Sequence, residues 1–439
     1  MFLKISRFTI FCLFIAFLFV SMSRQVDAHV FVVEESPASN SVSEESPSEV
    51  LIQFSGKVDK SFSMKVFDQN NQEILTKSAT ISDDQKTISI QIPALPNGHY
   101  QVQYYVISSN DGHTIEGSYL FQVKWKVQPS TNAENMKEDT TGGGVGKLEE
   151  AGNEADVITV PSAIEDKIDK NYFEIFNYSA KAIYYFGLLL LLGWLMIWQV
   201  IKSYSFELKK KFLFYGMIFQ FLHLIGLVAF LLVQMNIFSA HGISFEFDFP
   251  LDTNFGKLWI VSLVLSLIGF LSLFKNQWLD SIWILLIGLT KSLNGHTQEF
   301  EPSLLLVGLN SIHILASAFW VAGLVFILLF WRKQQLYVKS FIPIFSKGAL
   351  ISIVLLSISG SMISYFYLPD REALLTDWGF MLLAKIVIVL GVLILGAIIR
   401  KRMKRGRLAD LKSLIKLDFI FMVLLVIIVS ILTSLNPLP

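Results

Sequence analysis

Between residues 29 and 127, short runs of β-branched and aromatic residues are separated by clusters of Pro, Gly, Asn and Asp. Within a run such as Tyr100 to Tyr104, apolar and polar positions alternate, which places one face of a strand inward and the other outward. Similar runs cover 50–54 and 87–91, with no helical period between them. This pattern predicts an antiparallel β-sandwich.

Long apolar stretches begin at Tyr178 and continue to the end of the chain. A helix needs about 20 mainly apolar residues to cross a bilayer. Eight stretches approach this length, at approximately 178–201, 212–234, 257–275, 278–294, 303–331, 345–367, 379–399 and 415–434. The fourth is the shortest and contains Asp280, Lys291 and Asn294. We therefore expect residues 171–439 to form an all-α polytopic membrane bundle of about eight transmembrane helices.

The first 28 residues have the pattern of a secretory signal. Lys4 and Arg7 precede a short apolar run, and Val26 and Ala28 place small side chains before a cleavage point. Cleavage there would leave His29 as the mature N-terminus. An uncleaved anchor helix is the alternative interpretation.

Residues 128–170 differ from the segments on both sides. They contain Gly142-Gly143-Gly144, few large apolar residues, and 4 Lys against 10 Asp plus Glu. Such a segment cannot bury enough apolar surface to offset its ordering entropy. We expect a flexible acidic linker between the sandwich and the bundle.

The composition excludes a purely soluble protein. Apolar residues make up 53% of the chain and charged residues 16%, against a usual charged share of about 25%, and the mean hydropathy is +0.53. Lys plus Arg and Asp plus Glu are equal at 36 each, so no net charge points to nucleic acid as a partner. The single cysteine, Cys12, lies in the expected signal and excludes disulfides and thiolate metal sites.

Loop charges predict how the bundle is oriented. Cytoplasmic loops of membrane proteins carry an excess of Lys and Arg. The loops after the first, third, fifth and seventh stretches hold most basic loop residues, including those from Arg400 to Lys416, whereas the alternate loops hold Lys257, Lys291 and Arg371. We therefore expect a multi-pass protein of the cytoplasmic membrane, with the sandwich and the C-terminus on the extracytoplasmic side.

Two features of the expected sandwich point to a metal site. An N-terminal His29 would offer its α-amine and its imidazole to one ion and close a chelate ring. Asp111 and His113 are two residues apart, so in an extended segment both point to the same face. Nitrogen and oxygen ligands in a tetragonal set favour Cu(II), which also stands at the top of the divalent affinity order. The alternative interpretation is a simple Asp-Gly turn with His113 on the surface.

These residues stand within segments that resemble the CopC copper-binding family. The resemblance rests on His29-Val30-Phe31 with Glu35 to Ala38, on Gly98 to Val102, and on Ser108 to His113 followed by Gly117 to Val123. Members of this family are exported Greek-key sandwiches, and the resemblance implies that His29, Asp111 and His113 bind Cu(II). Some members also have a Met-rich Cu(I) site, but this segment contains only Met64, which implies a Cu(II)-only domain.

Histidines and methionines are the candidate ligands of the bundle. His223 and His313 fall within apolar stretches, and His241 and His296 fall in the expected outer loops. A polar side chain in a span usually faces the bundle interior, although an interhelical hydrogen bond is the simpler interpretation. Thioethers suit Cu(I), and the methionines towards the outer ends of spans are Met235, Met362 and Met381. Methionine is also ordinary apolar filler.

The bundle resembles the CopD family of multi-span copper-transport proteins. The segments that carry this resemblance are Thr253 to Trp259, Asn294-Gly295-His296, Leu309 to His313, Trp320 to Leu324, Trp378 to Lys385 and Ser434 to Pro437. Together the two resemblances imply copper acquisition outside the cell and translocation through a His- and Met-lined helical bundle. The implied cofactor is copper, as Cu(II) in the sandwich and with Cu(I) as a candidate state in the membrane.

Other functions stay open at this stage. Copper resistance by sequestration or export fits the same residues, because no motif encodes the direction of transport. His223 and His313 on different helices also permit a haem-binding redox protein. An N-terminal His chelate occurs in copper-dependent oxidases, but Asp111 would fill the position that oxygen needs, so we expect no enzyme. The expected partners are copper ions and the lipid bilayer, with a periplasmic or extracellular copper chaperone or reductase as a candidate.

Overall fold

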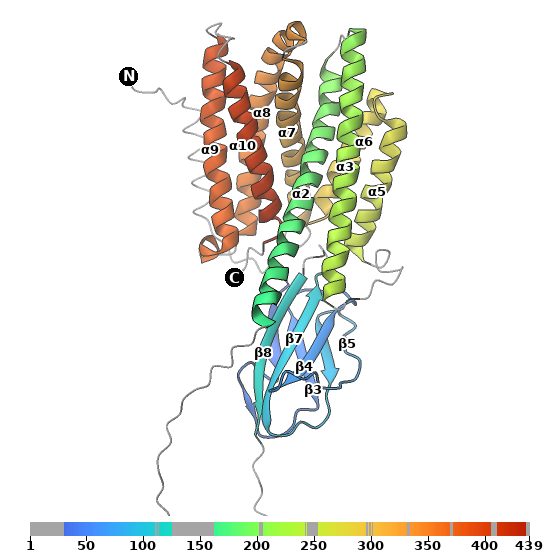
Figure 1. Cartoon of the computed structure of the whole chain (residues 1–439), viewed down its shortest axis with the longest axis vertical. Coiled ribbons are helices and arrows are strands. Elements are labelled where there is room, and N and C mark those ends of the chain that lie inside the picture. Colours follow the sequence, from blue (N-terminus) through green and yellow to red (C-terminus); the bar gives the residue numbers. More distant parts are fainter. Residues whose placement is uncertain are drawn as a thin grey trace, which may run out of the picture.

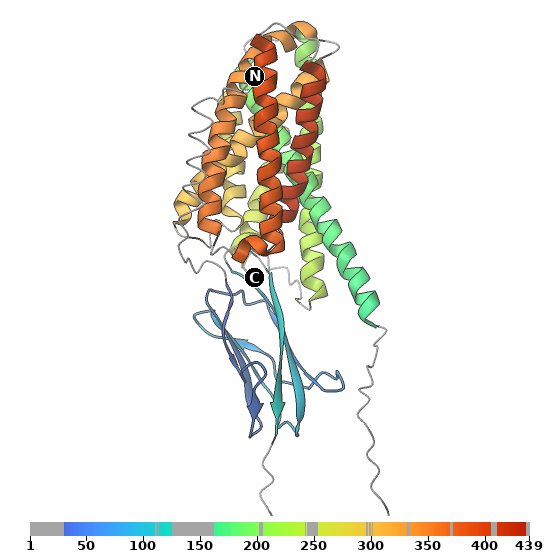
Figure 2. The same ribbon diagram turned by 90° about the vertical axis from the view of Figure 1, so that its left-hand side faces the viewer.

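The computed structural model describes residues 30–109, 112, 114–124, 162–201, 205–241, 243, 253–295, 297, 300, 302–331, 334–368, 372–404 and 411–435. Strands occupy the N-terminal part of the described chain and helices occupy the rest (Figure 1). Two views at right angles show the strands against one end of the helical bundle (Figures 1 and 2). The expected secretory signal, 1–28, lies outside the described residues.

Two four-stranded sheets form the N-terminal domain. Its strands are β1 (Val32–Ser36), β2 (Val42–Ser43), β3 (Glu49–Phe54), β4 (Ser63–Asp68), β5 (Thr80–Ile81), β6 (Thr87–Gln91), β7 (Gly98–Ile107) and β8 (Thr114–Val123). The strand orders are β1-β3-β6-β5 and β2-β8-β7-β4. Val50, Ile52 and Phe54 alternate along β3 and are buried in the core, as the sequence pattern predicts. The sandwich is confirmed, except that the short β2 runs parallel to β8.

The longest strands, β7 and β8, form a hairpin whose turn reaches the bundle. Their pairing runs from Gly98 opposite Val123 to Ile107 opposite Thr114. Beyond it, the Gly112 N–H donates to Ser108 O at 3.0 Å, and Gly112 has a φ of +73°. Glycine adopts this left-handed conformation without the steric cost that a Cβ brings. The turn that contains the Asp-Gly-His sequence therefore requires glycine at its centre.

Eight helices follow within the described residues. They are α2 (Ser162–Val200), α3 (Phe206–Ala240), α5 (Asn254–Ser272), α6 (Gln277–Leu293), α7 (Ser303–Phe330), α8 (Gln335–Tyr367), α9 (Asp377–Lys404) and α10 (Leu411–Leu432), with a 3-10 helix, η2 (Glu372–Leu375), before α9. Seven of them are long and apolar enough to cross a membrane. The exception is α6, whose 17 residues rise roughly 26 Å, less than the ~30 Å hydrocarbon core of a bilayer. The expected fourth span is therefore a shorter helix.

A buried carboxylate explains one polar residue of this shorter helix. Phe274 has a φ of +63° in the tight turn between α5 and α6. Its N–H donates to Asp280 Oδ1 at 2.9 Å, and the Asp280 side chain is fully buried. Asp280 therefore stabilises the turn that joins the two helices.

The first helix begins before the expected linker ends. We expected flexible chain up to residue 170, but α2 starts at Ser162. No Gly or Pro lies between Ser162 and Gly187, and a helix that is already nucleated in the membrane segment extends at little cost. The expected linker therefore overlaps the first nine residues of α2. The part from 128 to 161 lies outside the described residues, and its flexibility stays a prediction.

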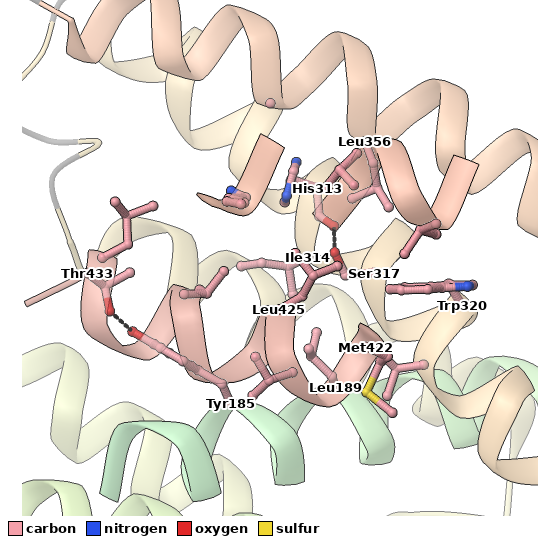
Figure 3. A pocket seen from close by; sticks show the side chains of 18 of the residues that line it. Tyr185, Leu189, His313, Ile314, Ser317, Trp320, Leu356, Met422, Leu425 and Thr433 are labelled. Atoms are coloured by element: carbon pink, nitrogen blue, oxygen red, sulfur yellow. Dashed lines mark hydrogen bonds between the residues drawn. The ribbon is translucent and has the colours of Figure 1, made fainter. Parts of the chain in front are cut away.

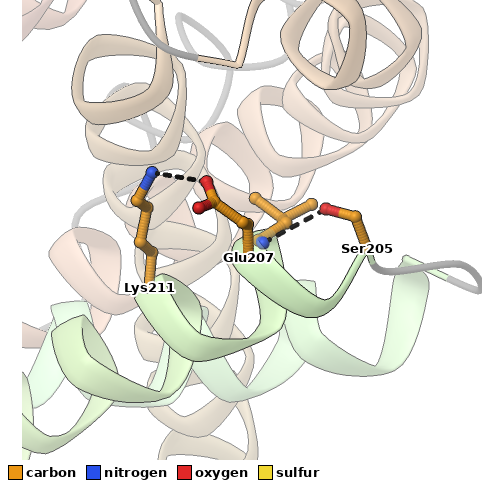
Figure 4. A network of polar contacts seen from close by, with 4 residues as sticks. Ser205, Glu207 and Lys211 are labelled. Atoms are coloured by element: carbon orange, nitrogen blue, oxygen red, sulfur yellow. Dashed lines mark hydrogen bonds and ion pairs between the residues drawn. The ribbon is translucent and has the colours of Figure 1, made fainter.

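Helix α3 starts at the end of the bundle opposite the sandwich. Ser205 Oγ accepts the Leu208 N–H at 3.2 Å, and Lys211 Nζ lies 3.2 Å from Glu207 Oε2 (Figure 4). Helix α10 ends at Leu432, at the same end of the bundle as the sandwich (Figure 1). This arrangement agrees with the expected topology, while the side of the membrane that each end faces stays a prediction.

Helices α2 and α3 pack closely in the bundle core. Trp194 of α2 is fully buried and donates its indole N–H to Phe212 O of α3 at 2.9 Å. A Cβ on Gly187 would lie 2.7 Å from the backbone N of His223, and one on Gly226 would lie 2.7 Å from the backbone of Tyr184. The two glycines therefore allow a close crossing that encloses His223.

Candidate functional site

The three expected Cu(II) ligands, His29, Asp111 and His113, lie outside the described residues. Their described neighbours meet at one end of the sandwich. The Ser55 N–H donates to Phe31 O at 2.9 Å, and the Ser109 N–H donates to Lys57 O at 3.1 Å. One short loop, 55–57, thus joins the start of the described chain to the residues that follow β7.

An apolar cluster connects the sandwich to the bundle, and we call it the domain interface. It consists of Tyr105 and Ile107 from β7 together with Phe238, Ile243, Phe255 and Trp259 from the bundle. A Cβ built on Gly112 would lie 2.8 Å from a carbon of the Phe255 ring. The glycine of the Asp-Gly-His sequence therefore lies directly against the bundle.

His241, the C-cap residue that directly follows α3, lies beside the domain interface. Its ring stacks on Tyr105, with 3.9 Å between ring centroids and 14° between planes. Its Nδ1 lies 2.7 Å from Ile237 O, and its Nε2 lies 3.3 Å from Glu116 Oε2 of β8. A carbonyl oxygen only accepts hydrogen bonds, so Nδ1 carries the proton. Burial raises the pKa of the Tyr105 hydroxyl, which therefore stays neutral beside the imidazole.

A cavity of about 2390 Å³ begins at the domain interface and extends through the bundle. Near the sandwich, its wall includes Gly112, Glu116 and His241. At the other end, its wall includes Arg400 and Met403, close to the end of α9 that lies away from the sandwich. Residues of the cavity wall therefore lie both at Gly112 and at the opposite end of the bundle.

Side chains from facing helices line the middle of the cavity. His313, Ser317 and Trp320 follow one face of α7, and Met422 lies across from them on α10 (Figure 3). Asp418 also lines the cavity, and its Oδ1 is buried with no hydrogen-bond partner among the described residues. The wall is mostly apolar but includes an imidazole, a thioether and a carboxylate.

The hydrogen bonds around His313 select its tautomer. Its Nδ1 lies 2.9 Å from Ser359 Oγ of α8, and that hydroxyl donates to Leu355 O at 2.6 Å. Because the single hydroxyl proton is used there, Ser359 Oγ accepts the Nδ1–H of His313. The neutral ring therefore keeps its lone pair on Nε2, the form in which imidazole binds a metal.

One described candidate histidine, His223, does not line this wall. His223 is fully buried against Tyr184, with 5.6 Å between ring centroids. Neither ring nitrogen of His223 has a hydrogen-bond partner within the described part of the chain. His223 does not line the cavity that His313 lines, so the structure does not bring this pair together. His296 lies outside the described residues.

The three candidate methionines are absent from the described cavity wall. Met235 is 37% exposed on α3, and Met362 and Met381 are half-buried on α8 and α9. The wall instead contains Met403 and Met422. Met403 lies in the basic run at the end of α9, and Met422 lies in the apolar part of α10, where the hydrophobic pattern does not distinguish a lipid-facing side from a cavity-facing side.

Comparison with known proteins gives matches to both halves of the chain. Residues 32–124 match the CopC domain family. Residues 339–432 match the family described as Copper resistance protein D, and this segment contains most of α8 and all of α9 and α10. Copper transport protein CutJ of Bacillus subtilis (strain 168) is 23% identical over 438 residues, which cover 94% of this chain and 75% of CutJ. Protein YobA of Escherichia coli (strain K12) is 33% identical over 100 residues, 22% of this chain and 80% of YobA.

Two solved structures are similar to part of the chain. The crystal structure of CopC from Methylosinus trichosporium OB3b is 28% identical and covers 25% of this chain and 100% of that chain, with a TM-score of 0.21. PcoC, a methionine rich copper resistance protein from Escherichia coli, is 26% identical and covers 22% of this chain and 100% of that chain, with a TM-score of 0.20.

Proposed function

The chain belongs to the CopC–CopD fusion family of copper transport and resistance proteins, and from this premise we propose that it imports copper across the cytoplasmic membrane. In this proposal the sandwich captures Cu(II) on the extracytoplasmic side, and the ion then crosses the bundle through the cavity. CutJ, which is similar along nearly the whole chain, is named a copper transport protein. Copper is the transported substrate.

The proposed capture ligands are His29, Asp111 and His113. The CopC match over 32–124 supports them, as does the loop that joins the chain after residue 29 to the residues after β7. An N-terminal amine, two imidazoles and a carboxylate form a nitrogen and oxygen set that suits Cu(II). The only methionine of the domain, Met64, is 6% exposed in the core, so we propose no Cu(I) site in the sandwich.

The observation that carries the proposal is the extent of the cavity wall along the bundle. It begins at Gly112, between two proposed ligands, and reaches Arg400 and Met403 at the opposite end of the bundle. Along this route His313 offers a lone pair on Nε2 and Met422 offers a thioether. Imidazole binds both oxidation states of copper, and thioether prefers Cu(I). We propose both side chains as ligands along the route.

Four lysines line the described cavity wall and oppose a free cation, namely Lys181, Lys291, Lys385 and Lys401. Lys181 Nζ lies 2.6 Å from Ser434 Oγ, and Lys291 Nζ lies 5.0 Å from the centroid of the Tyr185 ring. Lys385 makes no hydrogen bond or ion pair within the described residues. Their positive charges repel copper ions. Copper therefore passes by exchange between ligands rather than as a free ion.

The membrane potential favours inward movement of a cation by about 2.3 kcal/mol per charge per 100 mV. No Walker motif occurs in the sequence, so this potential or the copper gradient is the proposed driving force. A copper chaperone or reductase outside the membrane is a proposed partner that would load the sandwich or reduce the ion.

Cellular copper content in copper-poor medium tests the proposal. Cells that lack the protein should contain less copper than cells that have it, and the wild-type gene should restore the difference. A rise in copper on deletion would instead indicate export or sequestration. Neither the comparisons nor the described residues favour the haem alternative, and an absorbance spectrum of the purified protein without a Soret band would agree with that.

A further inference from the structure

One polar pair crosses from the sandwich to the bundle. Glu116 belongs to β8 and His241 ends α3, and their Oε2 and Nε2 atoms lie 3.3 Å apart. The side chains are 53% and 37% exposed, and both line the cavity that begins at Gly112. The pair is therefore accessible to an ion that leaves the Asp-Gly-His turn.

A hydrogen bond on the other side of the His241 ring selects its tautomer. Nδ1 donates to Ile237 O at 2.7 Å, so the neutral ring carries its lone pair on Nε2. Backbone carbonyls commonly orient metal-binding histidines in this way. Tyr105 stacks on the ring and holds its plane. A neutral His241 would thus point a lone pair at the carboxylate of Glu116, an arrangement that is favourable only when a proton or a metal ion lies between them.

The separation of the two atoms fits a shared metal ion. Nitrogen and oxygen ligands lie about 2.0–2.2 Å from a divalent metal, so two of them are roughly 2.8–3.1 Å apart at the right angle of a tetragonal Cu(II) site and roughly 3.3–3.6 Å apart at the tetrahedral angle. The observed separation of Glu116 Oε2 and His241 Nε2 is 3.3 Å. Imidazole and carboxylate together suit Cu(II) better than Cu(I).

We infer that Glu116 and His241 form a transfer site for Cu(II) between the two domains. The inference rests on the proposed function, since it gives copper a step between the capture ligands and the cavity. Each domain supplies one ligand, so the site is complete only when the sandwich is docked on the bundle. Copper crosses the domain interface in the oxidation state in which the sandwich binds it.

The competing explanation is an ion pair that only fastens the sandwich to the bundle. Protonated His241 would then bind Glu116 without a metal. The two explanations differ in which substitutions restore function. A Lys–Glu pair keeps opposite charges but loses the imidazole, whereas exchanging the two residues keeps both metal ligands.

The first arm of the test measures the initial rate of radioactive copper influx into liposomes that contain the full-length chain. Glu116→Gln and His241→Gln should each lower the rate at least tenfold, and the double variant should be no slower, because both residues bind one ion. The Glu116→Lys/His241→Glu chain should keep the low influx rate, and the Glu116→His/His241→Glu chain should recover an influx rate close to that of the wild type. His99→Ala is the matched control, because His99 is exposed at the far end of the β7–β8 hairpin.

The second arm measures copper binding by electron paramagnetic resonance. In a His29→Ala/His113→Ala chain, which has lost both imidazoles of the proposed capture site, added Cu(II) should give a signal with coupling to one imidazole nitrogen, and the further change His241→Gln should abolish it. Wild-type influx by the Glu116→Lys/His241→Glu chain, or a signal that does not depend on His241, would overturn the transfer site. If the wild-type chain moves no copper, the proposed function fails, and the spectrum still decides whether the pair binds Cu(II).

Discussion

Replacing Gly112 with Ala tests whether the sandwich works while docked on the bundle. A Cβ at this position would lie 2.8, 3.0 and 3.1 Å from three carbons of the Phe255 ring. Gly112 also has a φ of +73°. The substitution therefore adds backbone strain, which is local to the turn, and a steric clash, which exists only in the docked arrangement.

The two effects have comparable sizes. A residue other than glycine in the left-handed conformation costs about 1–2 kcal/mol. Inserting a methyl group into a well-packed contact costs about 1–3 kcal/mol. Since a factor of ten corresponds to 1.4 kcal/mol, the clash alone should lower the docked population roughly 5- to 140-fold relative to the undocked one.

A double-mutant cycle separates the clash from the strain. Phe255→Ala removes the ring that the added methyl would touch, so Gly112→Ala should disturb docking less in that background. The assay is amide hydrogen exchange at the end of α3, near Phe238 and Ile243, in full-length protein in a bilayer. The expected coupling between the two substitutions is about 1–3 kcal/mol. Equal effects of Gly112→Ala in both backgrounds would refute the docked arrangement.

Separate predictions concern the capture site, the cavity and the positive charge on the cavity wall. Adding one residue before His29 of the mature chain, or replacing His113 with Ala, should weaken Cu(II) binding by orders of magnitude in a competition titration, and an unchanged affinity would exclude the N-terminal chelate. The same affinity should fall as the pH drops below about 6.5, because imidazole binds a metal only without its proton; a constant affinity from about pH 8 to 5 would contradict imidazole ligation. His313→Ala should remove most copper accumulation in cells, with Met217→Leu on the exposed side of α3 as a control; equal accumulation by both variants would exclude His313 from the route. Lys385→Met should raise the influx rate, because it removes a positive charge from the cavity wall; a slower rate would show that the lysine helps transport.

Alternation of apolar and polar residues made the sandwich predictable. Strand β6 has the bounds that the pattern predicts, Thr87–Gln91, because a shift by one residue would turn its inward side chains to solvent. The start of α2 was not predictable in this way. The segment from Ser162 to residue 170 has mainly charged residues, and its helix continues from the apolar span that follows.

The candidate site shows why a single sequence reveals only part of a route. His241 stands out as a histidine next to an apolar stretch, whereas Glu116 is an ordinary polar position of β8. Their contact joins two domains, and no local pattern encodes it. Met422 and Asp418 were missed for a related reason, because hydropathy identifies a spanning helix without telling which of its faces lines a cavity.

Copper influx into sealed liposomes that carry the purified full-length chain tests the central claim most directly. With Cu(II) on the side of the sandwich and a negative potential inside, we predict saturable accumulation that falls close to background in the His313→Ala chain. A wild-type chain that binds Cu(II) but admits no more copper than empty liposomes would contradict import through the cavity, as would net movement of copper towards the side of the sandwich.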